Sequence, residues 1–243
     1  ADNGASFSPD GVSLGWLSMP RAGYEADRQQ IVIHDLGSQT QRALAEGWDR
    51  SAGTIAWSPD SRTIITEADN VGNHSLFAID AASGAVRTLV EKGTNGGPLP
   101  FGERVLYVHD DLCSPAELFS VRRDGTDVRP ITRQNVSKFA AARMGDYEQF
   151  SFTGANGEQV FAYLVKPVDF DASRKYPLAF LIHGGPQGSF GDHFHYRWNP
   201  QAYAGAGFAV VMVDFHGSTG YGQAFCDAIR ADWGGAPFED LMK

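Results

Sequence analysis

The feature that most constrains the fold is the stretch from Lys175 to Gly222, which contains two short apolar runs. The runs cover residues 178–182 and 208–213, and each is followed by a glycine-rich segment. Runs that are apolar at every position are typical of strands buried on both faces of a parallel sheet. Asn199-Pro200 indicates the start of a helix between them. The stretch therefore predicts a strand, a helix and a second, parallel strand.

Two glycine-rich segments follow the predicted strands. His183-Gly184-Gly185-Pro186 follows the first, and Gly217-Ser218-Thr219-Gly220-Tyr221-Gly222 follows the second. In open α/β sheets, ligands bind beyond the carboxyl ends of the strands, so we expect both segments at one site. The second segment lacks a lysine and the spacing of a phosphate loop, which argues against nucleotide binding.

A repeat occupies the chain before residue 140. Ser6-Phe-Ser-Pro-Asp-Gly11 recurs 50 positions later as Ala56-Trp-Ser-Pro-Asp-Ser61, and strand-turn-strand segments carry Asp35, Asp80 and Asp124 at spacings of 45 and 44. A period near 45 with several short strands per unit is typical of β-propeller blades. We therefore expect about three blades. Because propellers typically carry about 4–8 blades, we expect the others to precede the first residue.

The pattern G-x-S-x-G, which surrounds the nucleophile of many hydrolases, occurs as Gly11-Val12-Ser13-Leu14-Gly15. A nucleophile elbow joins a buried strand to a helix. Here the pattern follows a Ser-Pro-Asp turn and continues into Trp16-Leu17-Ser18-Met19-Pro20, a predicted blade strand. We therefore predict that Ser13 is a structural residue and not a nucleophile.

The two glycine segments behind this repeat resemble the prolyl oligopeptidase family of serine peptidases, and in particular its acylaminoacyl-peptidase and dipeptidyl-peptidase V branch. The resemblance implies a partial β-propeller of about three blades in residues 1–140, followed by the N-terminal part of an α/β-hydrolase catalytic domain in residues 141–243. A hairpin expected from residues 148–153 and 159–165 would open the hydrolase sheet. If part of that sheet is absent, the strand ending at Asp214 would have an unpaired edge, and the chain alone would be poorly soluble.

The resemblance also implies an activity: cleavage of short peptides near their N-terminus through an acyl-enzyme, by a dipeptidyl- or acylaminoacyl-peptidase. The α/β-hydrolases order their triad as serine, acid and histidine, and the resemblance places all three beyond Lys243. We therefore expect this chain alone to be inactive. By the same resemblance, the backbone N–H of Gly185 is one donor of the oxyanion hole. Such a donor typically contributes about 10²–10³ in rate.

Tyr221, His193 and His195 are further candidate residues. Tyr221 is a candidate for the edge of the substrate site, and anchoring of its own loop is an equal alternative. His193 and His195, beside Asp192, have an H-x-H spacing that zinc ligands can show. No third ligand lies at helical spacing, so we predict a loop that lines the mouth of the active site and not a metal site.

Further polar residues are expected to have structural roles. His216 stands where many members of the resembled family carry arginine, and we expect it only to stabilise its loop. The acidic pairs Asp110-Asp111 and Glu239-Asp240 are expected to face solvent.

Composition limits the partners. The formal net charge is −9 and no basic stripe is present, which argues against nucleic acid. No apolar run approaches the roughly 20 residues that span a bilayer, so no membrane association is expected. Cys113 and Cys226 provide neither a disulfide framework nor metal-ligand spacing.

We expect no cofactor. The expected partners are short peptides and the remainder of the same enzyme, on this or a separate chain. Homo-oligomerisation stays open, as does a periplasmic, secreted or cytoplasmic location.

Two functions of other classes stay open. The first is a carboxylesterase or lipase, since such enzymes use a similar His-Gly-Gly loop; the repeats count against it. The second is a non-catalytic propeller module that binds a partner protein. The two glycine segments count against that alternative, because a binding module does not need an oxyanion loop.

Overall fold

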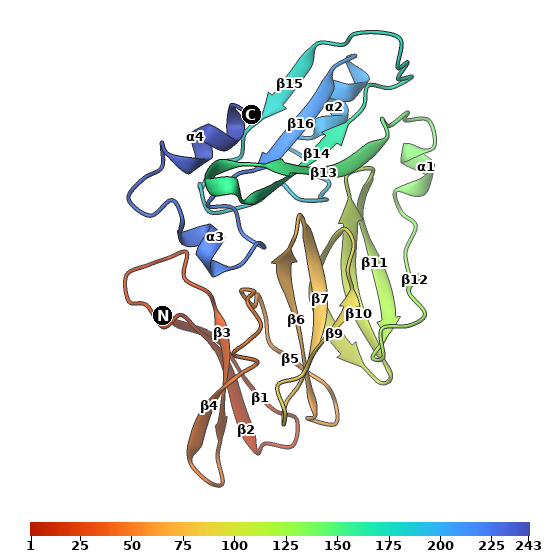
Figure 1. The fold of residues 1–243 in the computed structure, drawn as a ribbon. Helices are drawn as coiled ribbons and strands as arrows, with labels where there is room; N and C mark the ends of the chain where they lie inside the picture. The colour runs from red at the N-terminus through yellow and green to blue at the C-terminus, as the bar shows by residue number, and fades with distance from the viewer. The chain divides into compact units, whose positions relative to one another are not determined.

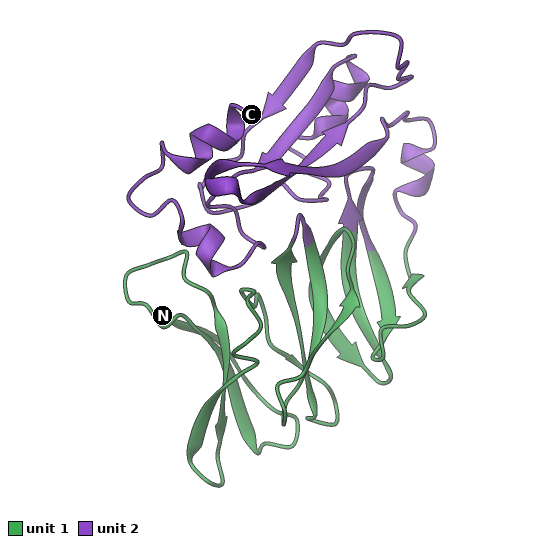
Figure 2. Ribbon diagram, viewed as in Figure 1, with its two compact units in different colours: residues 1–70, 74–109, 118–132 green, residues 71–73, 110–117, 133–243 purple.

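The structure, a computed structural model, describes all residues from 1 to 243 and divides into two compact units (Figure 2). The first unit comprises residues 1–70, 74–109 and 118–132, and the second comprises residues 71–73, 110–117 and 133–243. None of the helices combines the length and the apolar character needed to cross a membrane. The assignment of residues 1–140 and 141–243 to two types of domain stays a prediction.

The first unit is built from three groups of four consecutive strands (Figure 1). The groups are β1 Asp2–Phe7, β2 Ser13–Ser18, β3 Gln30–Asp35 and β4 Thr40–Leu44; β5 Ala56–Trp57, β6 Thr63–Asn70, β7 Asn73–Asp80 and β8 Val86–Val90; and β9 Thr94–Phe101, β10 Arg104–Asp111, β11 Ser114–Arg122 and β12 Arg129–Pro130. The second and third groups form one eight-stranded sheet, because β7 and β9 pair in parallel at His74 and Thr94. The groups do not close into a ring.

The sequence repeat corresponds to a recurring turn. The hydroxyls of Ser8 and Ser58 each lie 2.6 Å from the aspartate two positions later, and each accepts a 2.9 Å hydrogen bond from the backbone N–H five positions later. Asp35, Asp80 and Asp124 likewise accept backbone N–H groups of the turns that follow them. These side chains satisfy backbone donors that the turns would otherwise leave unpaired.

Strand β6 shows how the first unit builds its core. Ile64 packs in one hydrophobic cluster with Leu17 of β2 and Ile33 of β3, whereas the next residue, Ile65, packs in a second cluster with Val105 of β10. Successive strand side chains point to opposite faces, so β6 is covered on both faces. Ser13, the serine of the G-x-S-x-G pattern, is the first residue of β2, which pairs with β3. It therefore does not lie on a turn between a strand and a helix.

The second unit contains a four-stranded sheet in the order β13-β14-β16-β15. Its strands are β13 Tyr147–Thr153, β14 Gln159–Val165, β15 Leu178–Leu181 and β16 Ala209–Asp214, and its helices are α1 Val136–Phe139, α2 Pro200–Gly205, α3 Gln223–Asp227 and α4 Ala236–Leu241, with a 3₁₀ turn, η1, at Ala155–Gly157. The β13–β14 pair is antiparallel, as the hairpin prediction requires, and β15 and β16 are parallel. The side chain of Asn199 caps α2 by accepting a 2.8 Å hydrogen bond from the N–H of Gln201.

The two predicted parallel strands differ in burial. Strand β16 lies between β14 and β15 and is largely buried, whereas β15 is one of the two edge strands. Leu178 at the start of β15 is 59% exposed, and Ile182 just after it is 55% exposed. The prediction that both runs are buried on both faces is therefore wrong for β15. Leu178, Phe180 and Ile182 share one face of the strand and are exposed, and an apolar run does not reveal whether another layer covers that face. The unpaired edges of the sheet belong to β13 and β15, and not to the strand ending at Asp214.

Candidate active site

The first glycine-rich segment, which follows β15, holds Gly185 in a conformation that only glycine adopts easily. Its φ is +133°, and a Cβ built there would lie 2.6 Å from the backbone nitrogen of Gln187. The Gly185–Pro186 peptide bond is cis. Gly185 is exposed, and its N–H donates no hydrogen bond within the chain. The segment therefore presents a backbone donor that a bound group can use.

His183, the first residue of this segment, is held by contacts with both glycine-rich segments. Its Nδ1 lies 3.0 Å from the carbonyl oxygen of Gly184, and its Nε2 lies 2.9 Å from Oγ of Ser218. Because a carbonyl only accepts, Nδ1 carries the hydrogen and Nε2 accepts from the Ser218 hydroxyl. The imidazole stacks on the ring of Phe215 with centroids 4.3 Å apart. His183 thus joins the first glycine segment to the second.

This His-Ser contact is not a catalytic dyad. Ser218 is fully buried, so its hydroxyl cannot reach a substrate. A triad acid binds the histidine nitrogen opposite the serine, whereas Oδ1 of Asp214 lies 3.8 Å from Nε2, the nitrogen that contacts the serine.

Asp214, the last residue of β16, fixes both glycine segments. Its Oδ2 accepts hydrogen bonds from the Ser189 hydroxyl at 2.7 Å and from the Tyr221 hydroxyl at 2.6 Å. Ser189 follows the first segment and Tyr221 belongs to the second. Burial raises the pKa of the Asp214 carboxyl, and the hydrogen bonds from Tyr221 and Ser189 oppose that rise. Sequence reasoning assigned Asp214 no role, although its place at the carboxyl end of a buried strand was a usable signal.

Tyr221 is engaged at both ends of its side chain. Its hydroxyl donates to Asp214, and its ring stacks on Phe161 of β14 with centroids 5.5 Å apart. These contacts favour the loop-anchor alternative. A role for Tyr221 at the edge of a substrate site stays a prediction.

The start of the second segment is fixed by a buried histidine between two carboxylates. Nδ1 of His216 lies 2.6 Å from Oδ2 of Asp240 in α4, and Nε2 lies 2.5 Å from Oε2 of Glu158, just before β14. Burial alone would lower the pKa of His216, but the hydrogen bonds to Asp240 and Glu158 outweigh it and raise the pKa above its ordinary value. The next residue, Gly217, has a φ of +100° and would place a Cβ 2.5 Å from Ile229.

The expectation that the acidic pairs face solvent is wrong for one member of each. Asp240 is 1% exposed and also accepts a 2.7 Å hydrogen bond from the N–H of Ala155. Asp110 is buried and accepts from the N–H of Phe194 at 2.7 Å and contacts Nδ1 of His193 at 2.6 Å. Each carboxylate is buried because distant segments supply its hydrogen-bond partners.

The two histidines of the H-x-H pattern have separate partners. His193 contacts Asp110, whereas Nδ1 of His195 accepts the N–H groups of Arg197 and Trp198 at 3.2 and 3.0 Å. The structure contains no group of three or more histidine, cysteine, aspartate or glutamate side chains arranged to hold a metal ion. His195 lines a cavity, described next.

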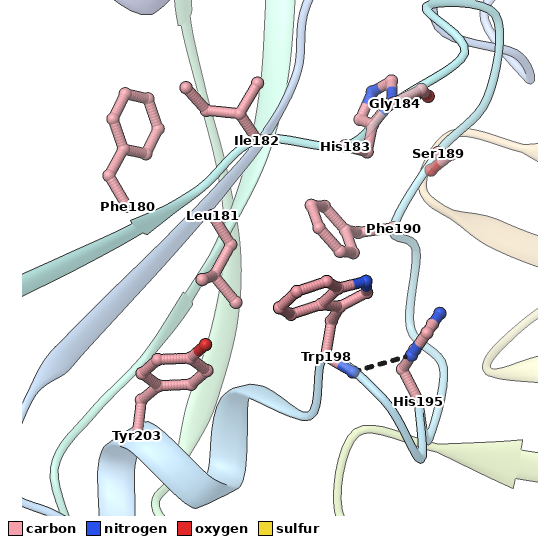
Figure 3. Close-up of a pocket in the computed structure, with 10 residues that line it drawn as sticks. All are labelled: Phe180, Leu181, Ile182, His183, Gly184, Ser189, Phe190, His195, Trp198 and Tyr203. Atoms are coloured by element: carbon pink, nitrogen blue, oxygen red, sulfur yellow. Dashed lines mark hydrogen bonds between the residues drawn. The ribbon is translucent and has the colours of Figure 1, made fainter.

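A cavity of about 320 Å³ lies beside the first glycine segment (Figure 3). Its walls come from the end of β15, from the loop after the segment and from α2. The lining residues are Phe180, Leu181, Ile182, His183, Gly184, Ser189, Phe190, His195, Trp198 and Tyr203. The site thus combines an unpaired backbone donor at Gly185 with an adjoining cavity that is mainly apolar.

Comparison with known proteins identifies a family to which this chain is similar. The sequence model of the prolyl oligopeptidase family matches residues 194–243. Dipeptidyl-peptidase 5 of Schizosaccharomyces pombe is 35% identical over 98% of this chain and 35% of its own length. The same enzyme of Trichophyton equinum is 38% identical over the whole of this chain and 34% of its own length. The chain therefore spans about a third of the length of the curated relatives it matches.

Solved structures agree in fold. The acylaminoacyl peptidase of Pyrococcus horikoshii superposes with a TM-score of 0.82 at 24% identity, over 96% of this chain and 36% of that protein. Dipeptidyl peptidase 4 of Porphyromonas gingivalis superposes with a TM-score of 0.68 at 21% identity, over 93% of this chain and 32% of that protein. At these identities the superpositions establish the fold alone.

Proposed function

Because the chain belongs to the prolyl oligopeptidase family, we propose that it is part of a serine peptidase that cleaves short peptides near their N-terminus through an acyl-enzyme. The relatives named dipeptidyl-peptidase 5 support release of dipeptides. The fold shared with acylaminoacyl peptidase keeps release of acylated amino acids as the second specificity.

One observation carries the proposal: the unpaired N–H of the exposed residue Gly185, in a loop that hydrogen bonds to Ser218 and Asp214 anchor on either side. When a serine attacks the peptide carbonyl, negative charge develops on the carbonyl oxygen, and a pre-oriented N–H stabilises it. Asp214 and His183 hold the two glycine segments together. The donor therefore needs little reorganisation during the reaction, which is what such a site requires.

The serine, acid and histidine of the reaction are proposed to come from residues outside positions 1–243. Within the chain, the G-x-S-x-G serine, Ser13, begins a strand of the first unit, and Ser218 is fully buried. The three strand groups of the first unit are proposed to be propeller blades. Their role would be to restrict entry to short or unfolded peptides.

Parallel assays test this proposal on the protein that carries this chain. We expect hydrolysis of dipeptidyl anilides or N-acetyl-aminoacyl anilides, with p-nitrophenyl acetate and longer acyl esters turned over less efficiently. Preference for the acyl esters would replace the proposal with the carboxylesterase alternative. Absence of turnover and of labelling by a fluorophosphonate would contradict serine-hydrolase chemistry altogether.

A further inference from the structure

A two-residue turn within the second unit contacts the second glycine-rich segment. Val71 and Gly72 connect β6 to β7, and residues 71–73 belong to the second unit (Figure 2). The backbone N–H of Val71 donates a 3.0 Å hydrogen bond to the carbonyl oxygen of Gly220. The turn therefore holds the second segment by its backbone, at a residue far away in the sequence.

The contacted residue, Gly220, lies between two residues that connect the second segment to the first. The N–H of Thr219 donates a 3.0 Å hydrogen bond to the carbonyl oxygen of Gly188, three positions after Gly185. The hydroxyl of Tyr221 donates to the same carboxylate as the loop that follows the first segment. A displacement of Gly220 would therefore also displace groups that hold the oxyanion loop.

The same turn contacts the loop after the first segment. The carbonyl oxygen of Gly72 accepts hydrogen bonds from the N–H of Asp192 at 2.8 Å and from the hydroxyl of Tyr163, a buried residue of β14, at 3.0 Å. A carbonyl oxygen has two lone pairs, so both are used. The turn thus connects the second segment, the loop after the first segment and the sheet.

The backbone of this turn is strained. The φ angle is +50° at Val71 and +71° at Gly72. Two-residue hairpin turns of this kind favour Asn-Gly, and a β-branched residue in the left-handed region is an outlier. The carbonyl oxygen of Val71 accepts hydrogen bonds from Nε2 of Gln149 at 2.9 Å and from Nδ2 of Asn73 at 3.2 Å. Such strain persists where surrounding groups fix the backbone, and it is concentrated at functional sites.

We propose that the Val71–Gly72 turn is a positioning element for the oxyanion loop, with Gly72 as its central positioning residue. The inference rests on the proposed function and adds to it a residue outside both glycine-rich segments. The turn acts through these segments and not on the substrate. An oxyanion donor is effective only when it is pre-oriented, and a misplacement of about 1 Å can cost about 10²-fold in rate. A disturbed turn should therefore slow the reaction more than it weakens substrate binding.

The test uses two variants of the protein that carries this chain, each with a matched control. Gly72→Ala places a Cβ against side chains of β13 and β14. Its control is Gly102→Ala, since Gly102 also has a positive φ in a hairpin turn, but nothing lies within 4 Å of the added Cβ. Tyr163→Phe removes one hydrogen bond to the turn and decides the test where Gly72→Ala does not fold. Its control, Tyr176→Phe, removes one hydrogen bond in the loop before β15.

Three readouts separate positioning from folding. The values of kcat and KM are measured per site titrated with a fluorophosphonate, so that unfolded protein is not counted. The inhibition constant of a peptidyl aldehyde is measured in parallel, because its adduct with a serine carries an oxyanion. Amide hydrogen exchange of peptides that cover residues 185–192 and 217–222 reports on the two segments without any reaction.

We expect Gly72→Ala to lower kcat per site by about 10- to 100-fold and Tyr163→Phe to lower it by about two- to tenfold. KM should change less than kcat, the inhibition constant should rise as kcat falls, and exchange should become faster in both segments. The two controls should leave all three readouts unchanged. An unchanged kcat per site in Tyr163→Phe and in folded Gly72→Ala overturns the inference, as do equal effects in the controls.

Failure of the proposed function would give a different result, because the unmodified protein would then show neither fluorophosphonate labelling nor hydrolysis. Hydrogen exchange would still decide the inference in that case. Faster exchange of both segments in the two variants, and not in the controls, would support positioning by the turn. Unchanged exchange would overturn it.

Discussion

Nδ1 of His216 lies 2.6 Å from Oδ2 of Asp240, and both side chains are buried. The opposite nitrogen of the ring, Nε2, contacts Glu158. A neutral imidazole has only one N–H, so it can donate to only one of these carboxylates, whereas the protonated ring donates to both. Two simultaneous hydrogen bonds, from His216 to Asp240 of α4 and to Glu158 before β14, therefore require the imidazole ring of His216 to be protonated.

The first prediction concerns pH. The pKa of His216 is raised above its ordinary value of 6.5, so protonated His216 stabilises the folded state. This contribution is complete below about pH 6.5 and is lost as the pH rises through the raised pKa. His216→Arg, which keeps a positive charge, should remove this part of the pH dependence, and His216→Gln should lower stability at pH 6 more than at pH 9. Denaturant unfolding at several pH values measures both, and an unchanged pH profile in His216→Arg would contradict the assignment.

A second prediction separates the two roles considered for Tyr221. As a loop anchor, it donates a hydrogen bond to a buried carboxylate, and such bonds contribute about 1.5–3 kcal/mol. Tyr221→Phe should lower the free energy of unfolding by about that amount and reduce kcat more than it raises KM. Tyr196→Phe is the control, because Tyr196 is 80% exposed and has no hydrogen-bond partner. A large increase in KM with unchanged stability would instead support a substrate-binding role.

Gly185 is the subject of a third prediction. Replacing it with alanine puts a Cβ against the backbone of Gln187 and forces φ out of its present range. We expect kcat in the intact enzyme to fall by about 10²–10³, the loss that typically follows removal of one oxyanion donor, with a smaller change in KM. Gly205→Ala is the control, since nothing lies within 4 Å of the Cβ it would add. Equal effects of the two variants would show that Gly185 is not part of the reaction.

A fourth prediction concerns the 243-residue polypeptide alone. Strand β15 pairs with β16 on one side only, and Leu178 and Phe180 along it are partly exposed. Exposed apolar edge strands promote association, so light scattering should detect oligomers or aggregates. Leu178→Lys should reduce them without lowering the thermal midpoint. A soluble monomer of the unmodified polypeptide would contradict this prediction.

The local sequence was sufficient to predict features that depend on neighbouring residues. The strand after Pro177, the capped helix after Asn199 and the strand before Asp214 are all present. The Ser-Pro-Asp repeats form equivalent turns, because the side chain that caps each turn lies within the motif. The residues that determine these features lie within a few positions of one another, so a single sequence is enough to predict them.

Features that depend on distant partners were not predictable in this way. The buried carboxylate of Asp240 contacts His216, which lies 24 positions earlier in the sequence. The buried carboxylate of Asp110 contacts His193, which lies 83 positions later. Sequence alone gives no sign of these pairings. The exposure of one face of β15 has the same cause, since it depends on which distant segments pack over that face. The role of Asp214 was missed because its two hydroxyl partners come from separate loops.

The most direct test of the proposed function is fluorophosphonate labelling followed by intact mass and identification of the labelled residue. The proposal predicts a label on the protein that carries this chain, at a serine outside positions 1–243, and no label on the isolated 26.3 kDa polypeptide. In the intact protein, Gly185→Ala should slow labelling, whereas Gly205→Ala should not. A label on any serine within residues 1–243 would contradict the assignment of this chain as the oxyanion-loop part of the enzyme.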